Sequence, residues 1–430
     1  MCRCTSERRF IGTFVYIPLI NMMKKAIFLF LAAFAAVSCS SSKSVSVTVT
    51  NTSSLDRDKE MVEVSMSEIN TKLRLANTAQ VVILDKNDQQ VPYQITYDAK
   101  LIFPSSVKAK SAENYTIQAG TPATFNAITC GKQYPERLDD VAWENDRIAF
   151  RTYGPALQAT GEKAFGYDIW AKRSEEPVVE ERYAMELNDS TNAKIKSLAK
   201  TDPAASKALR ESTSYHFDHG NGLDYYKVGP TLGAGTSAFL IDSALVYPHC
   251  YATQEVLDNG PLRFTVKLVY NPLAINGDST IETRVISLDA GSQLNKVALS
   301  YTKINKSLPL ATGIVIHTGS KDYAMSAQKG YIAYADPKDA INGQIYVAAV
   351  FPANVKETKV MPFKGAEASK IKDGAEGHVM AISDYEPGSE FLYYFGAGWS
   401  KWGFNTSKDW YKYVGEFAQK VRTPLTVTVK

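Results

Sequence analysis

Apolar and polar residues alternate along much of the chain after residue 43, and this pattern predicts β-strands. In residues 45–49 three valines are separated by Thr and Ser, which is the period of a half-buried strand. Four similar runs follow at residues 61–66, 80–84, 91–97 and 115–119. Strands at this spacing favour a small N-terminal β-sandwich over residues 44–121.

Residues 122–135 begin and end with proline and are predicted to be a linker. Strand-like runs then recur at residues 147–153, 166–172, 238–246, 262–270, 281–288, 296–303, 313–318, 345–351 and 390–395. Helical patterns are few: residues 192–209 are interrupted by Pro203, and residues 407–422 are amphipathic. The expected fold is therefore all-β, with the small sandwich followed by a large two-sheet sandwich over residues 136–430.

The first 43 residues follow a different pattern. Residues 22–38 combine two lysines, an apolar run too short to cross a bilayer, and small residues ahead of Cys39. This stretch resembles a bacterial lipoprotein signal, in which the chain is cut before the cysteine and Cys39 carries the lipid. An ordinary cleavable signal with an incidental Cys39 is the alternative.

Two flanking segments complete this reading of the N-terminus. Residues 1–21 precede a complete signal and are interpreted as an extension from a start codon placed too early. Residues 39–43 are a polar tether without an acidic cluster, which favours a periplasm-facing lipoprotein over a cell-surface one. The expected partners are a membrane, through the lipid anchor, and an oligosaccharide or polysaccharide.

Charge and cysteine content narrow the function. The formal net charge is +3, so no global field recruits nucleic acid, and no nucleic-acid partner is expected. After Cys39 only Cys130 and Cys250 remain. The sequence is compatible either with a disulfide between them or with two buried free thiols. The 24 tyrosines fit either a sugar-binding cleft or a large β core.

The densest group of reactive side chains lies in residues 215–235, YHFDHGNGLDYYKVGPTLGAG. Five glycines make this segment a loop, and loops on a β scaffold commonly carry sites. The candidate catalytic residues are His216, Asp218, His219, Asp224 and Tyr226. The alternative is a surface loop rich in turn residues.

The same loop offers two unspecific metal options. A transition ion would use the two histidines and two aspartates, whereas calcium would use Asp218, Asn221 and Asp224. Neither spacing is specific for a metal, so no cofactor is expected, and calcium is the alternative.

Residues 143–153, WENDRIAFRTY, suggest a substrate-binding strand. Alternation places Arg147 and Arg151 on one face, where guanidinium groups suit the carboxylate of an acidic sugar. Ion pairs with neighbouring acids would explain them equally well. The further substrate-binding candidates are Tyr153, Trp170, Lys172, His317, Trp399 and Trp402. His317 also fits a buried core histidine, and the tryptophans also fit packing under the last helix.

Three motifs resemble a known family: WENDRIAFRTYGPAL, GYDIWAK and the glycine-rich loop of residues 215–235. They are similar to a family of Bacteroidetes lipoproteins of unknown function, often encoded among polysaccharide-degradation genes, those for pectin especially. The resemblance implies a galactose-mutarotase-like super-sandwich as the main domain. It also implies carbohydrate work in a periplasmic or surface setting, while fold analogy alone does not choose the reaction.

The leading hypothesis is therefore an enzyme acting on uronic-acid-containing, pectin-type oligosaccharides. As a lyase it would neutralise the uronate with Arg147 or Arg151, remove a proton with His216 or His219, and protonate the leaving oxygen with Tyr226. As a hydrolase it would use Asp218 and Asp224. An epimerase would pair a histidine with Asp224. The alternative is a non-catalytic glycan-binding lipoprotein that holds sugar with Trp399, Trp402 and the tyrosine-rich loop of residues 215–235.

Overall fold

The computed structural model describes residues 44–74, 80–370 and 374–430. The predicted signal peptide, Cys39 and the tether lie outside the described residues. Within the described part of the chain, no helix has the length and apolar character needed to cross a membrane.

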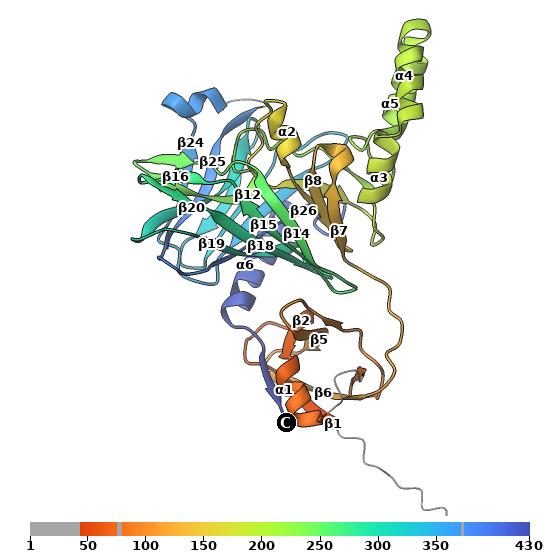
Figure 1. Cartoon of the computed structure of the whole chain (residues 1–430), viewed down its shortest axis with the longest axis vertical. Coiled ribbons are helices and arrows are strands. Elements are labelled where there is room, and N and C mark those ends of the chain that lie inside the picture. The colour runs from red at the N-terminus through yellow and green to blue at the C-terminus, as the bar shows by residue number, and fades with distance from the viewer. Residues whose placement is uncertain (1–43, 75–79, 371–373) are drawn as a thin grey trace, which may run out of the picture. The chain divides into compact units, whose positions relative to one another are not determined.

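A small sandwich of two sheets contains the first strands (Figure 1). The strand order is β27-β1-β6-β3 in one sheet and β2-β5-β4 in the other. The elements are β1 (Ser44–Asn51), β2 (Arg57–Ser65), α1 (Met66–Leu73), β3 (Val81–Leu84), β4 (Gln94–Ile95), β5 (Lys100–Val107), β6 (Ser111–Ala119) and β27 (Thr426–Val429). Val47 of β1 pairs with Val429, so β27 forms part of the small sandwich although it lies at the other end of the sequence.

Two larger sheets face each other across the main core (Figure 1). The five-stranded sheet has the order β13-β12-β20-β25-β24, with β12 (Ala234–Ile241), β13 (Ala244–Val246), β20 (Leu308–His317), β24 (Glu357–Pro362) and β25 (Ala375–Tyr385). The eight-stranded sheet has the order β14-β15-β18-β19-β26-β23-β22-β21. Its strands are β14 (Tyr251–Asn259), β15 (Arg263–Tyr270), β18 (Glu282–Asp289), β19 (Leu294–Tyr301), β21 (Asp322–Ser326), β22 (Tyr331–Ala335), β23 (Ile345–Val350) and β26 (Phe391–Trp399).

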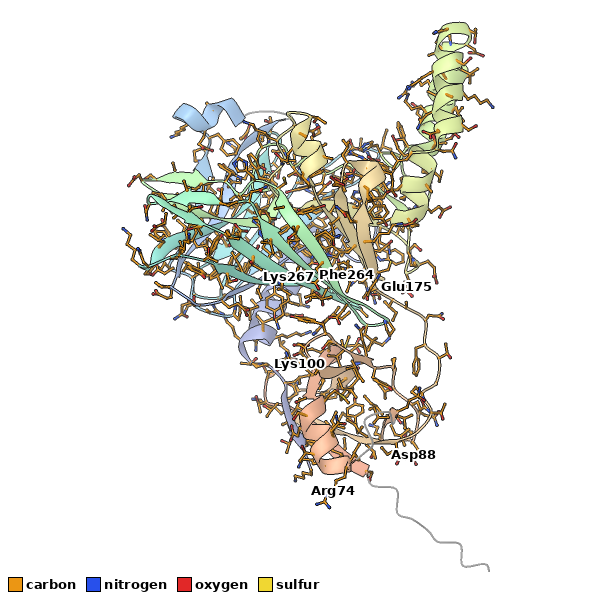
Figure 2. The ribbon with its side chains drawn as sticks, viewed as in Figure 1. Arg74, Asp88, Lys100, Glu175, Phe264 and Lys267 are labelled. Atoms are coloured by element: carbon orange, nitrogen blue, oxygen red, sulfur yellow. The ribbon has the colours of Figure 1, made fainter. Side chains whose placement is uncertain are left out.

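The strand period separates core from surface in these sheets. Phe264 and Lys267 both lie on β15 (Figure 2). Phe264 is fully buried in the main core, whereas Lys267 is partly exposed. An odd spacing along a strand places the two side chains on opposite faces. β16 (Leu273–Ile275) and β17 (Asp278–Thr280) pair with each other as a separate two-stranded hairpin.

A third sheet, of order β11-β10-β9-β8-β7, contains the motifs WENDRIAFRTY (residues 143–153) and GYDIWAK (residues 166–172). Its strands are β7 (Cys130–Tyr134), β8 (Asp140–Glu144), β9 (Ala149–Thr152), β10 (Asp168–Lys172) and β11 (Gly222–Asp224). One face, including Phe150 and Ile169, joins the main core. The other face, including Ala149 and Trp170, packs against Tyr183 of α3 (Val179–Glu186).

The remaining helices agree with the local signals. The predicted helix at 407–422 is confirmed as α6 (Ser407–Arg422), where Thr406 and Asp409 form a capping box. The pattern interrupted by Pro203 forms two helices, α4 (Asp189–Thr201) and α5 (Pro203–Thr213), which stand side by side as a hairpin (Figure 1). The short helices are η1 (Pro135–Arg137), α2 (Pro155–Ala159) and η2 (Gly365–Lys370).

The predicted fold class is confirmed: the chain is mostly β, with sandwich-like sheets and few helices. Cys130 and Cys250 are free thiols that are not bonded to each other.

Candidate functional site

A buried charge cluster occupies the outer face of the third sheet. Arg151 and Asp168 are directly opposite each other on β9 and β10, and Asp224 lies opposite Trp170 on the adjacent pair. Arg151 donates from Nε to Asp168 Oδ2 at 2.8 Å, and from Nη2 to the same oxygen and to Asp224 Oδ2, the latter at 2.7 Å. The Tyr153 hydroxyl donates to Asp168 at 2.7 Å. Cross-strand pairing therefore assembles this cluster.

Burial and the neighbouring charges shift the pKa values of Arg151 and Asp224 in opposite directions. Burial opposes the positive charge of Arg151, but Asp224, Tyr153 and Asp168 outweigh it and raise its pKa well above the ordinary value. Burial raises the pKa of Asp224 from 3.8 to about 6, although Arg151 opposes the rise. Arg151 is thus committed to two carboxylates, and its guanidinium is not available to a substrate carboxylate.

The two arginines predicted on one strand face lie apart in the structure. Arg147 precedes β9, its Nε is 3.2 Å from Asp146 Oδ2, and its side chain is 39 % exposed. Lys172 is fully buried in an ion pair with Glu144, with Nζ 2.7 Å from Oε2. Trp170 is buried under Tyr183 and Tyr215.

The histidines of the glycine-rich loop face outward. His216 Nδ1 is 2.8 Å from the Asp224 carbonyl oxygen, and because a carbonyl only accepts, this nitrogen carries the proton. The His216 side chain is 55 % exposed. His219 Nε2 binds the Ser214 carbonyl in the same way, at 2.9 Å.

Asp218 holds the turn of this loop and two cations. Its Oδ1 accepts from the backbone N–H groups of Gly220 and Gly222. Its Oδ2 lies 3.4 Å from Lys401 Nζ and 3.6 Å from Arg173 Nη2. Burial raises the pKa of Asp218, but the two backbone bonds and Arg173 outweigh this effect, so the pKa lies below its usual value. Asp218 therefore stays ionised beside two half-exposed cations.

A histidine–aspartate pair joins the two main sheets. His317 ends β20, and its Nδ1 lies 2.7 Å from Oδ1 of Asp336, which directly follows β22. The Tyr334 hydroxyl contacts the backbone of His317. Because a carboxylate accepts the Nδ1 proton, the lone pair of the imidazole is left on Nε2.

Tyr226 packs beside this pair. Its ring meets the His317 ring edge to face, with centroids 5.9 Å apart. Its hydroxyl is buried and has no hydrogen-bond partner among the described residues. Burial raises the pKa of Tyr226 well above 10, and the charges of Asp336 and Asp168 act in the same direction. Tyr226 is therefore a neutral phenol with a free proton donor.

Trp399 and Trp402 differ from the predicted stacking platform. Trp399 is 1 % exposed, and its Nε1 donates to the Asn342 carbonyl at 2.7 Å and to the Tyr225 hydroxyl at 3.1 Å. Trp402 is partly buried against the main core. Among the described residues, no group of three His, Cys, Asp or Glu side chains is arranged to hold a metal ion.

The structure thus brings together Tyr226 and His317, and separately Arg151, Tyr153 and Asp224. Sequence reasoning missed Asp336, Arg173 and Lys401. A signal for Asp336 was available, since it is a charged residue that directly follows the buried strand YIAYA.

These features define an all-β sandwich protein with a histidine–aspartate pair and a tyrosine at the ends of its strands. Residues 49–427 match the family described as a domain of unknown function (DUF4861), and the chain belongs to that family. It is 27 % identical over 378 residues to an uncharacterized protein P7 of Formosa agariphila, covering 86 % of this chain and 85 % of that protein.

Two solved structures are similar in part. An α-mannosidase from Enterococcus faecalis matches with a TM-score of 0.49 and 10 % identity, over 90 % of this chain and 46 % of that chain. A glycosyl hydrolase family 38 protein from Enterococcus faecalis matches with a TM-score of 0.49 and 8 % identity, over 90 % and 47 %. The chain spans about half the length of these structures.

Proposed function

We propose that the protein is a carbohydrate-active enzyme that cleaves uronic-acid-containing, pectin-type oligosaccharides by β-elimination. The observation that carries this proposal is the His317–Asp336 pair beside the unpartnered hydroxyl of Tyr226. A base with a free lone pair next to a neutral phenol is the combination that general acid–base catalysis needs.

In this reaction Nε2 of His317 removes the C5 proton of the uronate. The electron pair forms the C4–C5 double bond, the C4–O bond breaks, and Tyr226 protonates the departing oxygen. Proton transfer from the imidazolium back to the phenolate restores both groups. The step needs no co-reactant.

Acidification of the C5 proton requires a cation at the uronate carboxylate. Lys401 and Arg173 are suited to this role because both are charged, and their side chains are 29 % and 40 % exposed. They share the single carboxylate of Asp218, which leaves one unit of positive charge for a substrate. Lys401 also lies over the Trp399 ring, 5.2 Å from its centroid.

Hydrolysis through Asp218 and Asp224 has less support from the geometry. Asp218 is bound by two backbone N–H groups and two cations, and Asp224 is buried against Arg151. Because the Asp224 side chain is only 2 % exposed, a substrate has little access to it as acid or base.

The test is incubation of the chain that follows Cys39 with oligogalacturonates, following product mass and the ultraviolet absorbance of unsaturated uronides. Tyr226→Phe and His317→Ala should abolish formation of the double bond. Tyr97→Phe and His249→Ala are matched controls, because both residues are exposed and lie outside the strands that carry the pair, and they should retain turnover.

Other products would overturn the mechanism. Products heavier by one water would identify a hydrolase. Binding without any product would identify the glycan-binding lipoprotein instead, and full turnover by Tyr226→Phe would exclude this tyrosine as the acid.

We also propose that the protein is a lipoprotein anchored through Cys39 and facing the periplasm. The support is the basic, apolar and small-residue order of residues 22–38. A fatty-acid label should enter the wild-type protein and not a Cys39→Ser variant. Labelling of both would contradict the proposal.

A further inference from the structure

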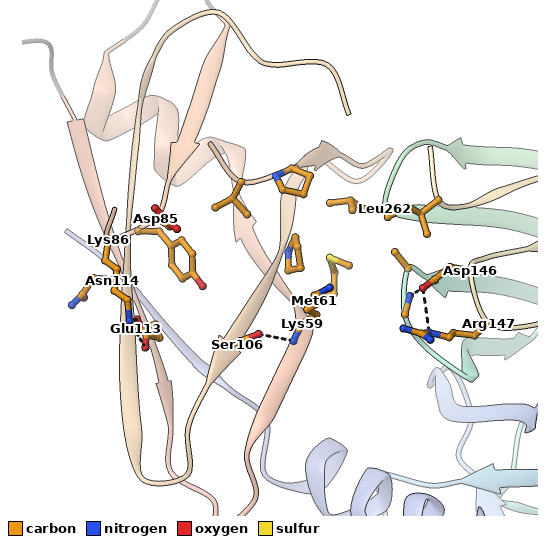
Figure 3. Close-up of a pocket in the computed structure, with 17 residues that line it drawn as sticks. Lys59, Met61, Asp85, Lys86, Ser106, Glu113, Asn114, Asp146, Arg147 and Leu262 are labelled. Carbon is orange, nitrogen blue, oxygen red and sulfur yellow. Dashed lines mark hydrogen bonds and ion pairs between the residues drawn. The ribbon is translucent and has the colours of Figure 1, made fainter. Parts of the chain in front are cut away.

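A cleft of about 510 Å³ lies between the small sandwich and the loops of the large one (Figure 3). Its volume is in the range of ligand-binding pockets. Lys59, Met61 and Ser106 line it from the small sandwich, and Arg147 and Leu262 line it from the opposite wall.

Polar contacts fix the two walls of this cleft. Arg263 binds Glu63 of β2 at 2.7 Å and Asp289 at 2.5 Å. The Gln94 side chain accepts from the N–H groups of Leu262 and Arg263 at 2.9 and 2.8 Å. The Gln94 contacts are buried and those of Arg263 are partly buried, so the cleft is a built feature of the fold.

Lys59 is directed into the cleft by an irregular strand. The register of β2 against β5 shifts between Arg57 and Glu60, and Lys59 has a φ of 47°, in the left-handed region. Its N–H donates to Ser106 Oγ at 3.0 Å, which in turn donates to Asp58. The Lys59 side chain makes no ion pair within the described ranges, so its charge is free for a ligand.

Arg147 supplies a second cation from the facing wall. Only its Nε contacts Asp146, and this carboxylate also accepts from the Gly291 N–H at 2.6 Å. Among the residues that the structure describes, neither Nη atom of Arg147 has a partner, so both remain for a bidentate contact with a carboxylate.

The other charges that line the cleft are already paired. Lys86 faces Glu113 at 3.4 Å, and Asp85 accepts from the N–H groups of Asn87 and Gln89. The apolar lining consists of Met61, Val91, Pro92, Pro104, Tyr115, Ile128, Leu262 and Ala290. Two available cations above apolar side chains match a chain that has carboxylates on its edges and C–H groups on its ring faces.

We propose that this cleft is a second binding site, for a segment of a carboxylate-bearing polysaccharide. This proposal rests on the proposed function, because the cleft would hold one segment of an acidic polymer while another segment of the same polymer reaches His317. Neither Arg147 nor Lys59 has a role in the proposed chemistry, so the two proposals fail separately.

The experiment compares polygalacturonate binding by wild type, Lys59→Gln, Arg147→Gln and the double variant at fixed salt. Each single substitution should weaken binding about threefold and the pair about tenfold, because exposed charge contacts are individually modest. Lys108→Gln is the control, since Lys108 is an exposed lysine of the same sandwich, paired with Asp56 outside the cleft. Turnover of short oligogalacturonates should stay unchanged in all of these variants.

Three results would overturn this site. They are unchanged polymer binding by the double variant, equal binding of an uncharged polymer of the same length, and equal loss of binding with Lys108→Gln. A Tyr226→Phe protein that still turns over substrate would instead contradict the proposed chemistry. It would not affect the test of the cleft, which measures polymer binding and not turnover.

Discussion

The imidazole of His317 and the carboxylate of Asp336 connect the two main sheets at a distance of 2.7 Å. His317 ends β20, in the sheet of order β13-β12-β20-β25-β24. Asp336 follows β22 of the eight-stranded sheet. The side chains are 8 % and 13 % exposed. Packing of the two sheets therefore sets the position of the pair.

We predict that Asp336→Asn lowers turnover of oligogalacturonates by about 10² to 10³, because the amide no longer fixes the Nδ1 proton of His317. Steady-state kinetics on the purified variant checks this. Asp242→Asn, at an exposed turn, is the control and should leave turnover unchanged. An active Asp336→Asn enzyme would remove the pair from the mechanism.

Lys401→Gln should raise KM for acidic oligosaccharides about threefold to tenfold, because the uronate loses one of its two cations. Lys408→Gln is a matched substitution at an exposed lysine of α6 and should change nothing. Competition assays with neutral sugars of the same length complete the comparison. If the Lys401→Gln variant keeps the preference for acidic sugars, Lys401 does not bind the uronate carboxylate.

Arg151→Met should lower the free energy of unfolding by about 3–5 kcal/mol, because it leaves Asp168 and Asp224 buried without their counterion. Urea unfolding followed by circular dichroism measures the loss. Arg147→Met removes a half-exposed arginine and should cost at most about 0.5 kcal/mol. Equal losses for the two substitutions would contradict a structural role for the buried cluster.

The pH dependence of stability should carry the signature of Asp140. Burial raises the pKa of Asp140 from 3.8 to about 6, although Arg151 and Arg137 oppose the rise. The folded state therefore binds this proton more tightly than the unfolded state. The resulting stabilisation is complete below pH 3.8 and is lost as the pH rises through about 6.

Asp140→Asn carries no proton and removes this contribution. Relative to wild type, the variant should gain stability between pH 4 and pH 7, measured as urea midpoints at both values. A constant difference between variant and wild type across this range would show that Asp140 has an ordinary pKa.

Val427→Asp should destabilise the small sandwich, because Val427 packs against its core from β27. Burying an unpaired carboxylate costs several kcal/mol, so limited proteolysis should release this region. Thr426→Asp, on the exposed face of the same strand, is the control. Equal protease resistance of the two variants would contradict a stabilising role of β27.

Local patterns predicted the strands and the last helix because burial repeats at a fixed period. The valines of 45–49 and the amphipathic face of 407–422 are examples. The role of Arg151 was not accessible in this way, since its partners Asp168 and Asp224 come from separate strands. The role of Asp336 could not be predicted for the same reason, because it depends on contact with His317, which lies in another sheet.

Pairing of β1 with β27 has a consequence for the order of folding. The partner of Val47 is Val429, so the small sandwich lacks an edge strand until residues 426–429 have been synthesised. Such a distant pairing is slow to form because of its loop-closure entropy. The small sandwich is therefore completed only after the strands of the large one have been synthesised, and until then β1 is an unpaired edge that can pair with other chains.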